Sequence, residues 1–188
     1  MFTQIAQFLI ETVAGFFVFA LLARFHFQWL RLPFRNPLGE FVVTVSNWLV
    51  LPARRIVPPL RQIDFASLVG AWLVQFAGLW AVYSVHGHDF FAAPGLVGLG
   101  ALALVDLLRY SLYLLIAAVI VHAVLSWVNP YTPLAPVFDA FARPFLRPIR
   151  RILPPIANID LSPLVLLVVL QVLLIPVAYA RGLVAAML

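Results

Sequence analysis

The sequence predicts an all-α membrane protein with four transmembrane helices in two tandem repeats. Hydrophobic residues fill 64% of its 188 positions and charged residues only 10%, which is more apolar surface than a water-soluble fold of this size can bury. A motif also occurs twice: PARRIVPP at 52–59, followed by Asp64, returns as PIRRILPP at 148–155, followed by Asp160. Each position lies 96 residues after its counterpart (148 minus 52, 160 minus 64), which predicts one duplicated unit with repeats at 1–92 and 93–188.

Four apolar stretches are long enough to cross a hydrocarbon core about 30 Å thick, which takes roughly 20 helical residues. They cover about 5–25, 66–85, 107–128 and 163–180. The first has no basic leader and no small-residue cleavage site after it, so we expect a retained helix and not a signal peptide. Residues 95–106 are apolar but rich in glycine, and we expect a short interfacial or partly embedded piece there that enters the third span near Asp106.

The arginines predict one orientation for both repeats. All twelve basic residues are arginine, and ten of them follow the first or the third span. The positive-inside rule therefore places both arginine-rich segments in the cytoplasm and both termini outside, in the periplasm of a bacterium. Because each repeat contains an even number of spans, we expect the copies to share one orientation around a pseudo-two-fold axis along the membrane normal.

Each arginine-rich segment contains an amphipathic helix, predicted over about 38–51 and 133–147 from the helical spacing of its apolar residues. Thr132 with Pro133 is typical of a helix start, and Pro52 and its counterparts predict an end before the Arg-Arg pair. An aromatic face with arginines nearby favours a helix in the headgroup plane. The candidate lipid- and partner-binding residues are Arg54, Arg55, Arg143, Arg147, Arg150, Arg151 and Trp48.

An aspartate precedes the second span of each repeat. In the second copy Ser162 and Pro163 predict a capped helix start, and Ser67 can cap in the first copy. We expect each carboxylate to tie the amphipathic helix to the span by pairing within its own repeat: Asp64 with Arg54 or Arg55, and Asp160 with Arg150 or Arg151. The alternative is that the carboxylates only complement the helix dipole.

Three ionisable residues lie inside or beside predicted spans: Glu11, Asp106 and Arg109. Asp106 and Arg109 share one helical face, so we expect them to pair near the outer interface. A shift of 98 residues, which aligns Trp29 with Trp127, places Arg109 opposite Glu11 and suggests a second pair across the repeats. Because embedded ionisable groups often mark ion paths, an ion channel or transporter is an alternative function.

No catalytic motif occurs in the sequence, which predicts a protein that is not an enzyme and holds no metal. His86, His88 and Asp89 are read as exposed polar residues. His26 and His122 stand near the cytoplasmic ends of the first and third spans, where facing histidines could ligate a haem; interfacial anchoring is the expected role. The arginines lack a solvent-exposed basic domain, so we expect membrane lipids and other membrane proteins as partners, and no nucleic acid.

The order of these motifs resembles the YggT family, also called YlmG. The matching residues of the first copy are Arg24, Trp29, Asn36, Pro37, Pro52, Arg54, Arg55, Pro58 and Asp64. Those of the second copy are Ser126, Trp127, Asn129, Pro130, Pro144, Pro148, Arg150, Arg151, Pro154, Asp160, Leu161, Ser162 and Pro163. The copies differ at two places: His122 stands near the position of Arg24, and the Ser-Pro after the aspartate is intact only in the second copy.

The resemblance implies a multi-pass protein of the bacterial inner membrane, linked to osmotic or cation stress tolerance or to cofactor assembly on a membrane complex. Together with the residue patterns, it favours a scaffold or assembly factor that binds the cytoplasmic lipid face and partner proteins. An ion channel and haem handling are the alternatives, and no other cofactor is expected.

Overall fold

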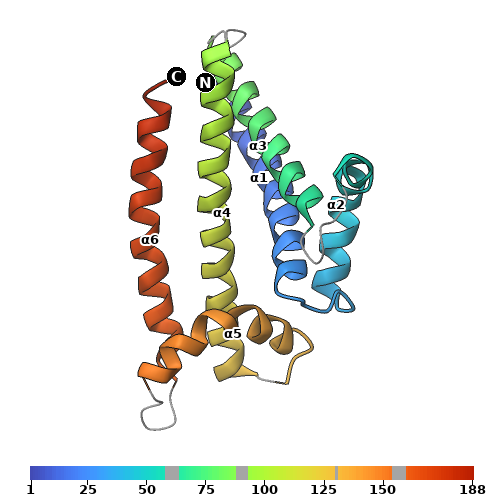
Figure 1. Cartoon of the computed structure of the whole chain (residues 1–188), viewed down its shortest axis with the longest axis vertical. Helices are drawn as coiled ribbons and strands as arrows, with labels where there is room; N and C mark the ends of the chain where they lie inside the picture. The colour runs from blue at the N-terminus through green and yellow to red at the C-terminus, as the bar shows by residue number, and fades with distance from the viewer. Residues whose placement is uncertain (58–63, 88–92, 130, 154–159) are drawn as a thin grey trace.

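The computed structural model describes residues 1–57, 64–87, 93–129, 131–153 and 160–188. These residues form six helices and no strand, which confirms the predicted all-α class. The helices are α1 (Phe2–Trp29), α2 (Pro37–Ile56), α3 (Phe65–Val85), α4 (Ala93–Val128), α5 (Ala135–Ile152) and α6 (Ser162–Ala185), as Figure 1 shows.

Each repeat has two long helices with a shorter helix between them: α1, α2 and α3 in the first, and α4, α5 and α6 in the second. The long helices α1, α3, α4 and α6 are long and apolar enough to cross a membrane. Within the repeats α1 packs on α3 and α4 on α6, whereas contacts of α4 with α1 and α3 join the repeats. Both chain termini lie at the same end of the molecule (Figure 1).

The prediction of a separate piece over 95–106 is wrong, because α4 runs without a break from Ala93 to Val128. The glycines of this stretch serve helix packing. A Cβ on Gly100 would lie 3.3 Å from the Trp72 ring of α3, and the indole nitrogen of Trp72 donates a hydrogen bond to the Gly100 carbonyl at 3.0 Å. At 1.5 Å per residue α4 is about 54 Å long, so it must tilt or project beyond a core of about 30 Å.

The prolines do not end the two shorter helices, which is a second correction. α2 continues through Pro52, and α5 continues through Pro144 and Pro148, so that both Arg-Arg pairs lie in a last helical turn. All three prolines are exposed, where the carbonyl that loses its intrahelical partner can turn outward. The arginines are therefore held on helices and not on loops.

The helix starts follow the sequence only in part. At α2 the Asn36 side-chain oxygen accepts a hydrogen bond from the Gly39 backbone nitrogen at 2.9 Å, with Pro37 as the first helical residue, which is a standard capped start. At α5 the predicted start at Thr132 is wrong, because the helix begins at Ala135 without a side-chain cap.

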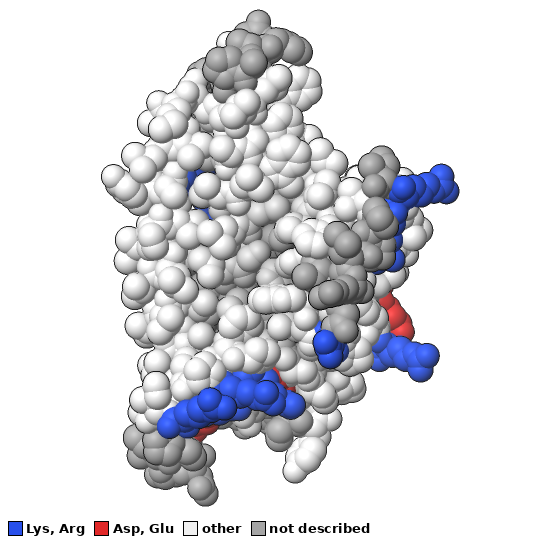
Figure 2. Space-filling view, in the orientation of Figure 1, with Lys and Arg blue, Asp and Glu red and all other residues white. Residues whose placement is uncertain are grey.

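Apolar side chains fill the contact between the repeats. One cluster combines Phe27 of α1 with Val119 of α4, Phe141 of α5 and Leu166 of α6. A second joins Leu22 of α1 to helices α2, α3 and α4. Figure 2 shows a broad uncharged surface over the long helices, with arginines along its lower and right-hand edges, over α5 and α2. The uncharged surface is the one expected of long helices that are surrounded by lipid.

Candidate functional site

In repeat one, a fully buried carboxylate ties α2 to the start of α3. Arg54 Nη2 lies 2.7 Å from Asp64 Oδ2, and the Asp64 side chain has 0% exposure. The Ser67 hydroxyl donates to the same oxygen at 2.7 Å. The predicted Arg54–Asp64 pair is thus present, whereas Ser67 does not cap α3 and binds the carboxylate instead.

Arg24 brings α1 into the same site. Its Nη1 donates to the Ser46 hydroxyl at 2.8 Å and to the Asn47 side-chain oxygen at 2.9 Å, and its Nε lies 3.8 Å from Asp64 Oδ2. Arg24 is itself buried. Two guanidinium groups thus face one carboxylate, and the hydroxyl and amide oxygens solvate the extra positive charge, which a buried ion pair needs. Sequence analysis missed Ser46 and Asn47, because their contact with Arg24 becomes visible only once α1 packs against α2.

The corresponding site of repeat two is simpler and more exposed. Arg150 donates from Nε at 2.8 Å and approaches from Nη2 at 2.7 Å, both toward Asp160 Oδ2, in the predicted pair. Its two side chains are 38% and 35% exposed. The other oxygen, Oδ1, accepts the Ser162 backbone N–H at 2.9 Å. Asp160 therefore accepts a backbone N–H at the start of α6, and the prediction of Ser162 as the cap is wrong.

Both carboxylates remain ionised in their sites. Burial alone would raise the pKa of Asp64, but hydrogen bonds from Arg54 and Ser67, aided by the Arg54 and Arg24 charges, lower it below its ordinary value. Burial opposes the shift at Asp160 too, where hydrogen bonds from Ser162 and Arg150 lower the pKa. The two ion pairs are therefore formed at neutral pH.

The remaining arginines of the two short helices take no part in these two ion pairs. Arg55, Arg147 and Arg151 are exposed, and the structure gives them no acidic partner among the residues it describes. Arg143 is also exposed but pairs with Asp139 one turn earlier on α5. Trp48 is 57% exposed and its ring lies edge-on to Phe17 of α1 at 5.4 Å.

A second polar cluster lies inside the spans around Asp106, which is 1% exposed. Its Oδ1 accepts the Arg181 Nε at 2.7 Å and lies 3.3 Å from Arg109 Nη2, the predicted partner. Its Oδ2 accepts the Gln75 amide at 2.9 Å. Since Gln75 belongs to α3 and Arg181 to α6, this carboxylate joins three helices and both repeats. Sequence reasoning missed these two residues; the only signal was a lone amide and a lone arginine in apolar helices.

The predicted contact between Glu11 and Arg109 is wrong. Glu11 is exposed and accepts a hydrogen bond from Gln7 of its own helix at 2.8 Å, while Arg109 uses Asp106 and the face of Tyr110. The repeat alignment compares equivalent positions, and equivalent positions of two symmetric units need not touch.

The two histidines have different surroundings in the structure. His26 contacts the Leu22 carbonyl through Nδ1 at 2.7 Å and stacks on Phe141 at 5.9 Å. His122 lines a separate cavity of about 360 Å³ between α4 and α5, with Ser126 and Asp139.

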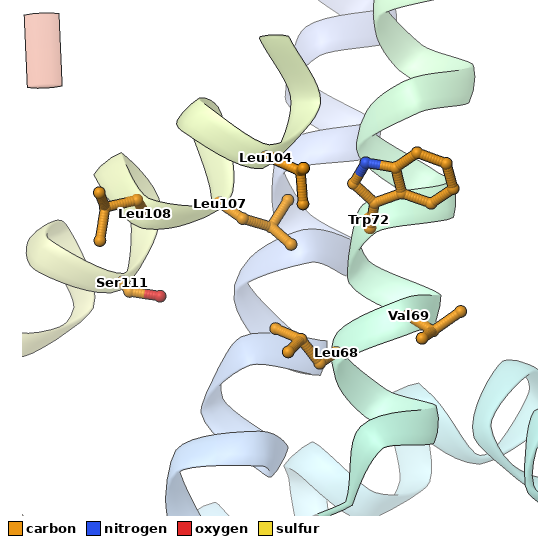
Figure 3. A pocket seen from close by; sticks show the side chains of 7 residues that line it. All are labelled: Leu68, Val69, Trp72, Leu104, Leu107, Leu108 and Ser111. Carbon is orange, nitrogen blue, oxygen red and sulfur yellow. The ribbon is translucent and has the colours of Figure 1, made fainter. Parts of the chain in front are cut away.

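The described residues contain no cluster of three metal-ligating side chains. His86 is exposed and bonds to the Val82 carbonyl through Nδ1 at 2.8 Å; His88 and Asp89 lie outside the described residues. A cavity of about 410 Å³ between α3 and α4 is lined by Leu68, Val69, Trp72, Leu104, Leu107, Leu108 and Ser111 (Figure 3). This lining is apolar except for one hydroxyl and the indole nitrogen, so it offers no acid–base pair.

The remaining motif residues lie at helix ends. Trp29 and Trp127 end their spans half-exposed or more, as expected for aromatic residues at a headgroup layer. The Asn129 side chain accepts the Tyr131 backbone N–H at 3.2 Å, and Pro163 lies buried in the first turn of α6. Pro130 lies outside the described residues.

Known proteins are similar to this chain in sequence over most of its length. The family model described as CCB3/YggT matches residues 3–85 and 101–180, one region per repeat. An uncharacterized protein YggT of Escherichia coli is 35% identical over 172 residues, covering 91% of this chain and 88% of the relative. A protein of Vibrio alginolyticus, described by its position in the proC 3′ region, is 34% identical, covering 88% and 89%. No solved structure matches. The double match of the family model, together with these relatives, shows that the chain belongs to the CCB3/YggT family of membrane proteins.

Proposed function

We propose that this protein is a non-enzymatic scaffold of the bacterial inner membrane, which holds anionic lipid headgroups on its cytoplasmic face and positions partner proteins there. One observation carries the proposal. Each short helix is fixed to the following span by an arginine–aspartate pair, while the next arginines, Arg55, Arg147 and Arg151, stay exposed without an acidic partner among the described residues.

Some arginines form structural ion pairs and others stay exposed, and this difference supports a role in binding lipid headgroups besides a role in topology. A guanidinium matches the oxygens of a phosphate in a planar, two-point contact. Each arginine near an anionic leaflet contributes about 1 kcal/mol before screening. Because α2 and α5 are fixed at their ends, the exposed guanidinium groups are presented by rigid elements and lose less conformational freedom on binding. Aromatic Trp48 and Phe41, both exposed, suit the apolar part of the same interface.

The experiment compares lipid retention by full-length variants in nanodiscs that contain anionic and neutral lipid. The test variant is Arg55→Gln with Arg151→Gln. The control removes equal charge at exposed residues of the α1–α2 connection, Arg31→Gln with Arg35→Gln. We expect native mass spectrometry to show a larger loss of retained anionic lipids for the test variant than for the control, whose arginines lie outside α2 and α5. Equal retention in both variants and the wild type would refute lipid binding by the short helices.

Partner docking is tested with the same pair of variants in native membranes. Crosslinking followed by mass spectrometry should recover a reproducible set of neighbouring membrane proteins for the wild type and the control variant. The test variant should lose those neighbours that are crosslinked through α2 or α5. A set that does not change among the three proteins would contradict a scaffold that works through these arginines.

The ion-path alternative has one observation in its favour, the charged cluster around Asp106 inside the spans. Its geometry favours a structural link, since the carboxylate is saturated by two arginines and an amide. Proteoliposomes under a cation gradient should therefore show no flux above empty vesicles, and an increase that Asp106→Asn abolishes would support the channel instead.

A further inference from the structure

The outer half of α1 presents a polar stripe on one face. Gln4, Gln7, Glu11 and Gly15 recur every three or four residues, so they lie along one side of the helix. Gln4 and Glu11 are exposed, and Gln7 is half-buried and donates to Glu11 at 2.8 Å. A Cβ built on Gly15 would have no neighbour within 4 Å. The described residues of this chain therefore leave most of the stripe uncovered.

Such a face is unusual on a helix surrounded by lipid. Glu11 precedes Arg24 by 13 residues, which is about 20 Å along the helix axis and less than the thickness of a core of about 30 Å. Ionisable side chains in spans almost always face the bundle interior or a water-filled cavity, or pair with another polar group, and they rarely face lipid. Exposed Glu11 therefore indicates that another protein helix covers this face in the membrane.

We infer that the covering helix is α1 of a second copy of this chain, packed in parallel around a two-fold axis. Copies inserted with one topology present identical stripes at equal depth. A glutamine carries both donors and acceptors, so it can pair with itself. The Gln7 amide has two N–H groups, and the bond to its own Glu11 uses one. The second can reach Glu11 of the other copy, one helical turn or about 6 Å away.

The other end of the stripe fits the same arrangement. Gly15 has open space where a side chain would stand, and small residues let two transmembrane helices approach closely while polar side chains hydrogen-bond across the contact. Toward the cytoplasmic end the same face of α1 becomes buried against its own chain, at Val18 and Leu22. The contact is therefore confined to the outer half of α1 and does not involve the arginine-bearing helices α2 and α5.

Disulfide crosslinking tests this dimer directly, because the chain has no cysteine. Gln4→Cys lies on the stripe, and Ile5→Cys is a matched control at the same depth, rotated by about 100° and 50% exposed. Oxidation in native membranes should give a dimer band of twice the chain mass for Gln4→Cys and little for Ile5→Cys. Equal crosslinking at both positions, crosslinking to a different protein, or no crosslinking would overturn the inference.

A second measurement does not depend on an engineered thiol. In dilution experiments in bilayers, followed by energy transfer between labelled copies, Glu11→Ala should weaken association by about tenfold, since interhelical hydrogen bonds in membranes are of modest strength. Thr12→Ala changes an exposed neighbour whose hydroxyl donates to the Phe8 carbonyl of its own helix, and it should leave association unchanged. A Glu11→Ala protein that associates like the wild type would overturn the role given to this carboxylate.

Discussion

Arg24 and Asp64 meet in the interior of repeat one, with the guanidinium Nε 3.8 Å from the carboxylate Oδ2 and side chains only 5% and 0% exposed. Arg54 approaches the same oxygen at 2.7 Å. A single buried carboxylate thus holds arginines from two helices. In repeat two, His122 replaces the first of these arginines, and the Arg150–Asp160 pair is left partly exposed. We therefore expect the two copies of the motif to contribute unequally to the free energy of unfolding.

Removing the carboxylate from repeat one should be far more costly than removing it from repeat two. Asp64→Asn leaves two arginines facing a neutral group in a buried site, and we expect a loss of about 3–5 kcal/mol in the free energy of unfolding. Asp160→Asn breaks a pair that water already reaches, so the loss should be about 1 kcal/mol or less. Unfolding by sodium dodecyl sulfate in mixed micelles measures both.

The double variant Arg54→Gln with Asp64→Asn is the control for this comparison. It removes one charge of each sign, and it should recover part of the stability lost in Asp64→Asn alone. Equal losses for Asp64→Asn and Asp160→Asn would contradict the difference in burial between the two sites.

Acid should destabilise the protein through the same carboxylates. The pKa of Asp64 and of Asp160 lies below its ordinary value of 3.8 in the folded protein. Each group therefore binds a proton more readily after unfolding. Its contribution is complete above the unfolded pKa and is lost as the pH falls through the lower folded value. Unfolding followed from pH 6 down to pH 3 should show a steeper fall in stability below about pH 5, and this part of the fall should be smaller in Asp64→Asn.

Much of this architecture follows from the sequence because its signals are local. The length of the apolar stretches predicts the spans. The duplicated motif with its aspartate predicts the two ion pairs, in each of which the arginine and the aspartate are ten residues apart. The helix boundaries were less predictable. Exposed prolines are accommodated inside α2 and α5. Gly100, one of the glycines that suggested a break in α4, packs against Trp72 of α3.

The long-range polar contacts could not be predicted from one sequence. Arg24 with Ser46, and Asp106 with Gln75 and Arg181, join residues that carry no common motif. Their pairing depends on which faces of the helices meet, and apolar spans with weak periodicity do not determine that rotation. The lone polar residue in an apolar helix is the signal that remains, because a buried amide or guanidinium needs a partner.

The Asp106 cluster should hold the repeats together. Asp106→Asn keeps an acceptor for Gln75 but removes the counter-charge of Arg109 and Arg181. We expect a loss of about 3 kcal/mol in unfolding free energy. Gln75→Leu removes a single hydrogen bond, and the loss should be about 1 kcal/mol. Both are measured by unfolding in mixed micelles, and an Asp106→Asn protein as stable as the wild type would show that the cluster is not structural.

Gly39 should tolerate no side chain. A Cβ there would lie 2.6 Å from the Phe34 carbonyl oxygen, a backbone atom that can move only if the capped start of α2 is rebuilt. We expect Gly39→Ala to destabilise the protein by about 1–3 kcal/mol. Gly182→Ala is the matched control in α6, where a Cβ would meet no atom within 4 Å, and it should be neutral or slightly stabilising. Thermal unfolding of both in the same detergent compares them.

The parallel arrangement of the repeats predicts equal labelling of the two arginine-rich helices. Arg55→Cys and Arg151→Cys, both exposed on the last turn of their helices, should react with a membrane-impermeant thiol reagent in inside-out vesicles and not in intact spheroplasts. His86→Cys, exposed beyond α3, should react with the opposite preference. The positive-inside rule predicts that ten arginines place both segments on one side. Labelling of Arg55→Cys and Arg151→Cys from different sides would exclude the two-fold related topology and, with it, a single cytoplasmic binding face.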